Sequence, residues 1–198
     1  MNLATVFTLS RVFIAPLFAY VFISGYHTDT NGWIWIAFSL AALIELSDLI
    51  DGTIARARNE VTDFGKVFDP IADSVSRQTV FISFMVSGII PLWMYLIFFY
   101  RDAFMQLLRI VCASSGVVLA ARKSGKAKAV LQGIATFGVI AVIALQRIYQ
   151  VNWIPAQILG FHPAFWVMLL PTIYTLLSVI DYVIPNRKLI KKMMAPKS

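Results

Sequence analysis

Long apolar stretches recur along almost the whole chain, and they constrain its fold more than any other feature. The hydrocarbon core of a bilayer is about 30 Å thick, so a helix needs roughly 20 mostly apolar residues to cross it. Within lipid the backbone must satisfy its own hydrogen bonds, which favours helices. Six segments meet this requirement, at about 7–24, 33–56, 68–90, 92–116, 126–149 and 163–185. The sequence therefore predicts an all-α integral membrane protein with six transmembrane helices.

The composition supports a membrane protein. Of the 198 residues, 59% are hydrophobic and 14% are charged, whereas soluble domains carry about 25% charged residues. No repeat or low-complexity segment divides the chain, so we expect a single membrane domain over residues 1–198. The first apolar segment has no basic region ahead of it, and we expect it to be a retained span and not a cleaved signal peptide.

Basic residues orient the predicted helices. They gather in the second-to-third and fourth-to-fifth connections and in the C-terminal tail, whereas 25–32, 88–91 and 150–162 contain neither Lys nor Arg. By the positive-inside rule, both termini are expected to face the cytoplasm. The net charge of +7 lies beside apolar segments, which favours membrane lipids with anionic headgroups, and no nucleic acid, as its partner.

Two of the predicted helices carry spaced carboxylates. Asp48 and Asp51 stand at i and i+3 near the end of the second helix, and Asp69 and Asp73 stand at i and i+4 near the start of the third. Each pair shares one helix face, so the four side chains can meet in one pocket. Without a cation they would repel one another. Hard oxygen ligands with this negative charge suit Mg²⁺ or Mn²⁺, with two ions expected. We therefore predict a polar metal-binding pocket near the cytoplasmic side.

The residues alone also allow other roles for these carboxylates. Carboxylates inside a membrane can form structural ion pairs or relay protons in a cation-coupled transporter. The arginines available for such ion pairs are Arg11, Arg77, Arg101 and Arg109.

The whole pattern from Asp48 to Asp73 reads D-x2-D-G-x2-A-R-x8-G-x3-D-x3-D and resembles the signature of the CDP-alcohol phosphatidyltransferases, integral membrane enzymes of phospholipid biosynthesis. The resemblance implies that two metal ions hold the pyrophosphate of CDP-diacylglycerol. It makes Asp48, Asp51, Asp69 and Asp73 the metal ligands and Asp73 also the general base. It implies that the CDP group is contacted by Gly52, Ala55, Arg56 and Gly65.

Further segments resemble the bacterial phosphatidylglycerophosphate synthase branch of this family. Asn2 and Thr8, with Arg11, match an N-x5-T-x2-R pattern, which adds Asn2 and Thr8 to the expected CDP-diacylglycerol site. Such a branch uses glycerol 3-phosphate as acceptor. The expected ligands for the acceptor phosphate are the cations of the matching segments, Lys66, Arg101, Arg109, Lys126 and Lys128.

The sequence departs from the branch at three positions: Asp102 replaces the usual Glu, Ala129 stands where Thr is usual, and Ser74 replaces a basic residue. These departures concern the acceptor and not the reaction class. Another acceptor, such as inositol phosphate, serine or a lipid, is the alternative to glycerol 3-phosphate. The resemblance also implies a homodimer in the bacterial inner (cytoplasmic) membrane.

Overall fold

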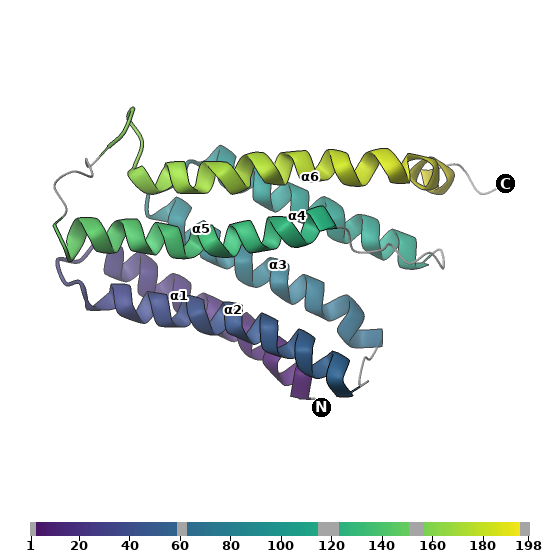
Figure 1. Cartoon of the computed structure of the whole chain (residues 1–198), viewed down its shortest axis with the longest axis horizontal. Helices are drawn as coiled ribbons and strands as arrows, with labels where there is room; N and C mark the ends of the chain where they lie inside the picture. The colour runs from purple at the N-terminus through teal and green to yellow at the C-terminus, as the bar shows by residue number, and fades with distance from the viewer. Residues whose placement is uncertain (1–2, 59–62, 115–122, 151–156, 195–198) are drawn as a thin grey trace.

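The computed structural model describes residues 3–58, 63–114, 123–150 and 157–194 (Figure 1). Side chains are described from Thr8 to Ser47, from Phe68 to Cys112, from Ser124 to Gln150, from Gln157 to Ile184, and at Arg187. The described chain folds into six helices: α1 (Leu3–Tyr26), α2 (Gly32–Arg58), α3 (Asp63–Val86), α4 (Leu92–Ser114), α5 (Lys123–Arg147) and α6 (Pro163–Met194). The all-helical expectation is confirmed, and each predicted apolar segment corresponds to one helix.

The helices lie side by side and alternate in direction, so that both termini lie at the same end of the bundle (Figure 1). We call this the terminal end and the opposite one the far end. The α1–α2, α3–α4 and α5–α6 connections lie at the far end. α1 packs against α2 and α3, α5 packs against α6 and α2, and α4 packs against α3 and α6. Because α1 and α3 run parallel, residues at the start of both helices meet at the terminal end.

Aromatic side chains form the core toward the far end. The ring centroid of Phe22 lies 5.0 Å from that of Phe84 and 5.3 Å from that of Trp33. A Cβ atom on Gly25 would lie 2.3 Å from Cγ of Trp33, so only glycine allows α1 and α2 to approach so closely here. These contacts fix the first three helices against one another at a distance from the predicted carboxylate pocket.

Arg147, at the end of α5, ties that helix to the α1–α2 turn. Its Nη2 donates to the carbonyl of Tyr26 at 2.6 Å and its Nη1 to the carbonyl of Thr28 at 3.0 Å. The guanidinium also lies 5.0 Å from the ring centroid of Tyr26. A hydrogen-bonded arginine at an apolar helix end satisfies backbone carbonyls that the turn leaves free.

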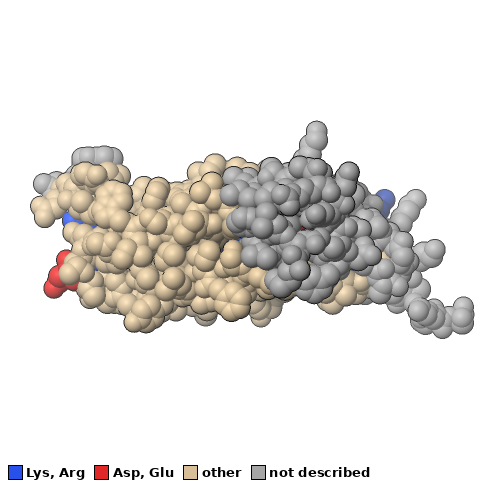
Figure 2. All heavy atoms as spheres, turned by 90° about the horizontal axis from the view of Figure 1, so that it is seen from below, with Lys and Arg blue, Asp and Glu red and all other residues tan. Residues whose placement is uncertain are grey.

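The outer surface is apolar, as expected for a protein in lipid. Phe13 is 75% exposed, Tyr20 70% and Leu170 63%. Figure 2 shows a face whose described surface carries no charged atoms over most of its length, with charges at its end. In the described part of the chain, the helices long and apolar enough to cross a membrane are Thr8–Tyr26, Ser124–Arg147 and Pro163–Ile184. The protein is therefore an integral membrane protein.

Among the described residues, α3 and α4 do not qualify as spans by apolar composition, and the reason is physical. In α2 the apolar stretch from Gly32 to Ser47 reaches the last residue of that helix whose side chain is described. α3 carries charged residues toward its start, and α4 carries them in its middle and toward its end. Charged residues lower the hydropathy of a helix even when they face the protein interior. The six-span count is therefore still a prediction.

Candidate active site

A cavity of about 520 Å³ opens between α3, α4 and α5 in the half of the bundle toward the terminal end. Its size lies in the range of about 300–1,000 Å³ that is common for small-molecule sites. Its lining brings together six predicted site residues: Asp69, Asp73, Arg101, Arg109, Lys126 and Lys128. Predicted site residues up to 59 positions apart in the sequence, Asp69 and Lys128, thus share one cavity, which we call the acceptor cavity.

The two α3 aspartates of the acceptor cavity are contacted from α1. Oγ1 of Thr8 donates to Oδ1 of Asp69 at 3.1 Å, and Nη1 of Arg11 lies 3.9 Å from Oδ1 of Asp73. Thr8 and Arg11 are 0% and 1% exposed, so both are held rigidly by packing. The parallel packing of α1 on α3 explains why both residues of this N-terminal pattern meet an aspartate of the signature.

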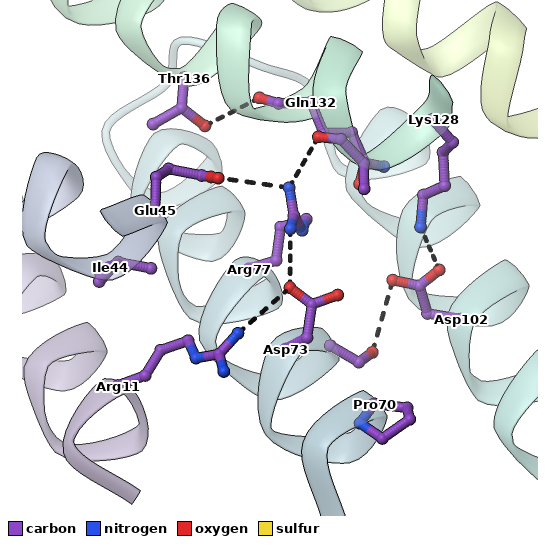
Figure 3. Close-up of polar contacts among 12 residues, drawn as sticks. Arg11, Ile44, Glu45, Pro70, Asp73, Arg77, Asp102, Lys128, Gln132 and Thr136 are labelled. Atoms are coloured by element: carbon purple, nitrogen blue, oxygen red, sulfur yellow. Dashed lines mark hydrogen bonds and ion pairs between the residues drawn. The ribbon is translucent and has the colours of Figure 1, made fainter. Parts of the chain in front are cut away.

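Arg77 is the main partner of Asp73, and it lies one helical turn deeper on α3. Its Nη2 donates to Oδ1 of Asp73 at 2.7 Å, and its Nη1 donates to the carbonyl of Ala129 on α5 at 2.9 Å. Nη1 also lies 3.6 Å from Oε1 of Glu45 on α2 (Figure 3). The ion-pair alternative for an intramembrane carboxylate is therefore observed at Asp73. Each described contact reaches Oδ1, on one side of the carboxylate.

Glu45 connects α2 to this network, and nothing in the sequence alone marks it as a site residue. A Cβ atom on Gly133 of α5 would lie 3.1 Å from Oε2 of Glu45, so this glycine makes room for the carboxylate. The signature residues Asp48 and Asp51 follow Glu45 on the same helix, one and two turns nearer the terminal end. On α3, Asp73 and Asp69 lie one and two turns nearer the terminal end than Arg77. The helix register therefore places both carboxylate pairs at similar depths.

Several predicted site residues lie outside the described side chains. The backbones of Asp48, Asp51, Gly52, Ala55 and Arg56 belong to α2, and those of Gly65 and Lys66 belong to α3. Asn2 lies outside the described residues altogether. Among the residues with described side chains, no three His, Cys, Asp or Glu groups gather as a metal cluster. The predicted four-aspartate set stays a prediction. The carboxylates of Asp69 and Asp73 are the kind of donor that Mg²⁺ and Mn²⁺ prefer.

Asp102 organises the other side of the acceptor cavity. Its Oδ1 accepts a hydrogen bond from Nζ of Lys128 and one of 3.0 Å from Nη1 of Arg101. Its Oδ2 accepts from Ser74 at 3.4 Å and from Gln78 at 3.2 Å. Asp102 and Lys128 are only 6% and 5% exposed. Two of the predicted phosphate ligands, Arg101 and Lys128, therefore already share a carboxylate.

Arg109 and Lys126 differ from Arg101 and Lys128, which share the carboxylate of Asp102. Both line the acceptor cavity, and Lys126 is exposed at its opening. Neither has a carboxylate partner among the described residues. In total the lining holds five cationic side chains against three carboxylates. The excess of positive charge suits an anion, and the two unpaired cations show where it can bind.

The Arg77 network generates a prediction about stability. Arg77→Met removes the partner of two partly buried carboxylates and should lower the free energy of unfolding by about 1.5–3 kcal/mol, the range for hydrogen bonds to charged groups. Thermal unfolding in detergent measures the loss. In the double variant Glu45→Gln/Arg77→Met the loss should be smaller than the sum of the two single losses, because the interaction is shared. Strict additivity would show that Glu45 and Arg77 do not interact.

Comparisons with known proteins identify the family of this chain. The sequence model of the family described as CDP-alcohol phosphatidyltransferase matches residues 1–185. The chain is 28% identical over 198 residues to a CDP-diacylglycerol--glycerol-3-phosphate 3-phosphatidyltransferase of Bacillus subtilis (strain 168), covering 96% of this chain and 97% of the relative. It is 35% identical over 89 residues to a protein of the same name from Treponema pallidum (strain Nichols), covering 45% of this chain and 41% of the relative.

A third relative carries a different name. A putative cardiolipin synthase of Mycobacterium bovis (strain ATCC BAA-935 / AF2122/97) is 37% identical over 93 residues, which cover 47% of this chain and 42% of the relative. The matched region thus spans less than half of the Treponema and Mycobacterium relatives and nearly all of the Bacillus one. The family resemblance inferred from the aspartate signature is confirmed: with a match over residues 1–185, the chain belongs to the CDP-alcohol phosphatidyltransferase family.

Proposed function

We propose that the protein transfers a phosphatidyl group from CDP-diacylglycerol to glycerol 3-phosphate, giving phosphatidylglycerol phosphate and CMP. The observation that carries this proposal is the acceptor cavity, in which two cations without a carboxylate partner among the described residues, Arg109 and Lys126, lie with two aspartates of the family signature. The names of the Bacillus and Treponema relatives support the same acceptor. A cation-coupled transporter is less consistent with five cationic side chains in one cavity.

The aspartates define the donor half of the site. Asp48, Asp51, Asp69 and Asp73 would hold two Mg²⁺ or Mn²⁺ ions. When bound, the ions supply the positive charge that binds the pyrophosphate and stabilises the leaving CMP. Thr8 orients the Asp69 carboxylate through its hydrogen bond. The other residues proposed to contact the nucleotide are Asn2, Gly52, Ala55, Arg56 and Gly65.

The cations define the acceptor half. Arg109 and Lys126 bind the phosphate of glycerol 3-phosphate, while Arg101 and Lys128 add positive potential from their fixed positions around Asp102. Lys66 is proposed as a further phosphate ligand from the adjoining connection. A phosphate bound here places the hydroxyls of the acceptor near Asp73, which lines the same cavity.

Asp73 acts as the general base. It takes the proton of the acceptor hydroxyl as that oxygen attacks the lipid-linked phosphorus, and the bond from phosphorus to the CMP oxygen breaks. Arg77 and Arg11 approach one carboxylate oxygen of Asp73. These contacts hold the carboxylate in place.

The proposed arrangement in the membrane has six spans, with the terminal end in the cytoplasm. The acceptor cavity then opens toward the aqueous phase that supplies glycerol 3-phosphate, while the acyl chains of the donor stay in lipid. Such an arrangement fits the bacterial inner membrane, and a homodimer is proposed with it on the family resemblance alone.

CMP release by the purified protein tests the proposal directly. With CDP-diacylglycerol and a divalent metal, we expect release to require glycerol 3-phosphate, to stop on chelation and to be lost in Asp69→Asn, since an amide is a poorer ligand for a hard cation. Inositol phosphate, serine and phosphatidylglycerol serve as competing acceptors. The last is included because one relative is named a cardiolipin synthase. Release with one of these and not with glycerol 3-phosphate would refute the acceptor and leave the transferase class standing.

The proposed orientation can be checked independently of activity. Tags placed at Met1 and at Ser198 should both be protected from membrane-impermeant labels in intact cells and become accessible after lysis. Six spans place both termini on the same side of the membrane, and the basic connections place that side in the cytoplasm. Labelling of one terminus alone in intact cells would overturn the span count.

Arg109→Ala tests the phosphate site. A charge-assisted contact is worth about 1.5–3 kcal/mol, so the KM for glycerol 3-phosphate should rise roughly ten- to a hundred-fold. The KM for CDP-diacylglycerol should change little. Arg147→Ala is the matched control, since it removes an arginine at the far end of the bundle. A rise confined to the KM of CDP-diacylglycerol would move Arg109 to the donor half of the site.

A further inference from the structure

Gln132 is a buried residue of the acceptor cavity for which neither the metal site nor the phosphate site gives a role. It lies on α5, one turn deeper than Lys128, it lines the cavity, and it is 0% exposed. Its Oε1 is buried and has no hydrogen-bond partner among the described residues. Buried polar groups are almost always paired, so an unpaired carbonyl oxygen at a cavity wall indicates a missing donor.

The rest of the Gln132 side chain is held firmly. Its Nε2 donates to Oγ1 of Thr175 on α6 at 3.3 Å. One turn further along α6, Oγ of Ser178 donates to the carbonyl of Thr175 at 2.7 Å and accepts from Nε of Arg101 at 3.3 Å. Thr175 and Ser178 are 0% and 2% exposed. A single buried turn of α6 therefore positions both Gln132 and Arg101 at the acceptor cavity.

Other neutral polar side chains of the cavity already have partners. Ser74 donates to Asp102, and Nε2 of Gln106 donates to the carbonyl of Pro70 at 2.6 Å. Oε1 of Gln132 is an uncharged acceptor, which suits an alcohol hydroxyl and not a phosphate oxygen. Because Gln132 lies deeper than Lys126 and Lys128, it is placed to meet the carbon-bound hydroxyls of an acceptor whose phosphate lies near the opening.

Resting on the proposed function, we propose that Gln132 determines acceptor specificity: its Oε1 accepts a hydrogen bond from the acceptor hydroxyl that does not react. In glycerol 3-phosphate this is the 2-hydroxyl, next to the attacking oxygen. The contact would favour a polyol phosphate over a simple hydroxyalkyl phosphate. Sites built to bond a hydroxyl discriminate strongly against analogues without it, because the buried partner is left unpaired.

A comparison of two acceptors tests this role. 3-Hydroxypropyl phosphate is glycerol 3-phosphate without the 2-hydroxyl. The wild-type protein should prefer glycerol 3-phosphate in kcat/KM by about ten-fold or more. Gln132→Met keeps the size of the side chain and removes the acceptor oxygen, and it should bring the two acceptors to within about two- to three-fold of each other. The KM for CDP-diacylglycerol should be nearly the same in the wild-type protein and in Gln132→Met.

Gln78→Met is the matched control. Gln78 also has a buried Oε1 without a partner among the described residues, but it lines the outward groove between α3 and α4 and not the acceptor cavity. The Gln78→Met substitution should change kcat/KM by the same factor for both acceptors, whatever the size of that change. The ratio of the two kcat/KM values does not depend on the amount of folded protein. If Gln132→Met is inactive with both acceptors, Gln132→Asn, which retracts the amide, should show the same loss of preference.

The outcomes separate this inference from the proposed function. A wild-type protein that uses both acceptors equally, or a Gln132 variant that keeps the wild-type preference, would overturn the role of Gln132 and leave the reaction intact. A wild-type protein that releases CMP with neither acceptor, but does so with inositol phosphate, serine or phosphatidylglycerol, would overturn the proposed acceptor instead.

Discussion

The buried guanidinium of Arg77 is the interaction on which the site depends. It reaches Asp73 on its own helix, the carbonyl of Ala129 on α5 and the carboxylate of Glu45 on α2. An unpaired arginine in an apolar bundle would be very costly, so these three partners are required together. By meeting that requirement, the network fixes α2, α3 and α5 at one depth. The signature aspartates lie one and two helical turns from this network, Asp48 and Asp51 along α2 and Asp73 and Asp69 along α3.

The sequence predicted the helices well because lipid leaves so few alternatives. Apolar stretches of about 20 residues in such a chain are helices, and the polar breaks between them locate the connections. The family resemblance named Asp69, Asp73, Arg109 and Lys126 as site residues, and all four line one cavity in the structure.

What the sequence could not supply is which helices meet, and at what relative height. Glu45 was not identified because nothing in α2 alone indicates a partner on α3. Lys128 was predicted as a phosphate ligand, but nothing in the sequence of α5 alone indicated that it is buried against Asp102 of α4. Gln132 shows its distinctive property only in three dimensions: it lines the acceptor cavity, and its buried Oε1 has no partner among the described residues. In each case the missing information is a contact between helices.

Asp102 shows how such a contact changes the chemistry of a residue. A carboxylate between Arg101 and Lys128 lowers the positive charge that an incoming phosphate meets at that point, and it holds both cations in defined places. Because the same Asp102 also accepts from Ser74 and Gln78 of α3, the wall of the acceptor cavity is joined to the helix that carries Asp69 and Asp73. Arg109 and Lys126 have no carboxylate partner among the described residues, and phosphate binding by them can then occur without rearranging the buried pair. The division between fixed and free cations accounts for a cavity that is both rigid enough to orient an acceptor and positive enough to attract one.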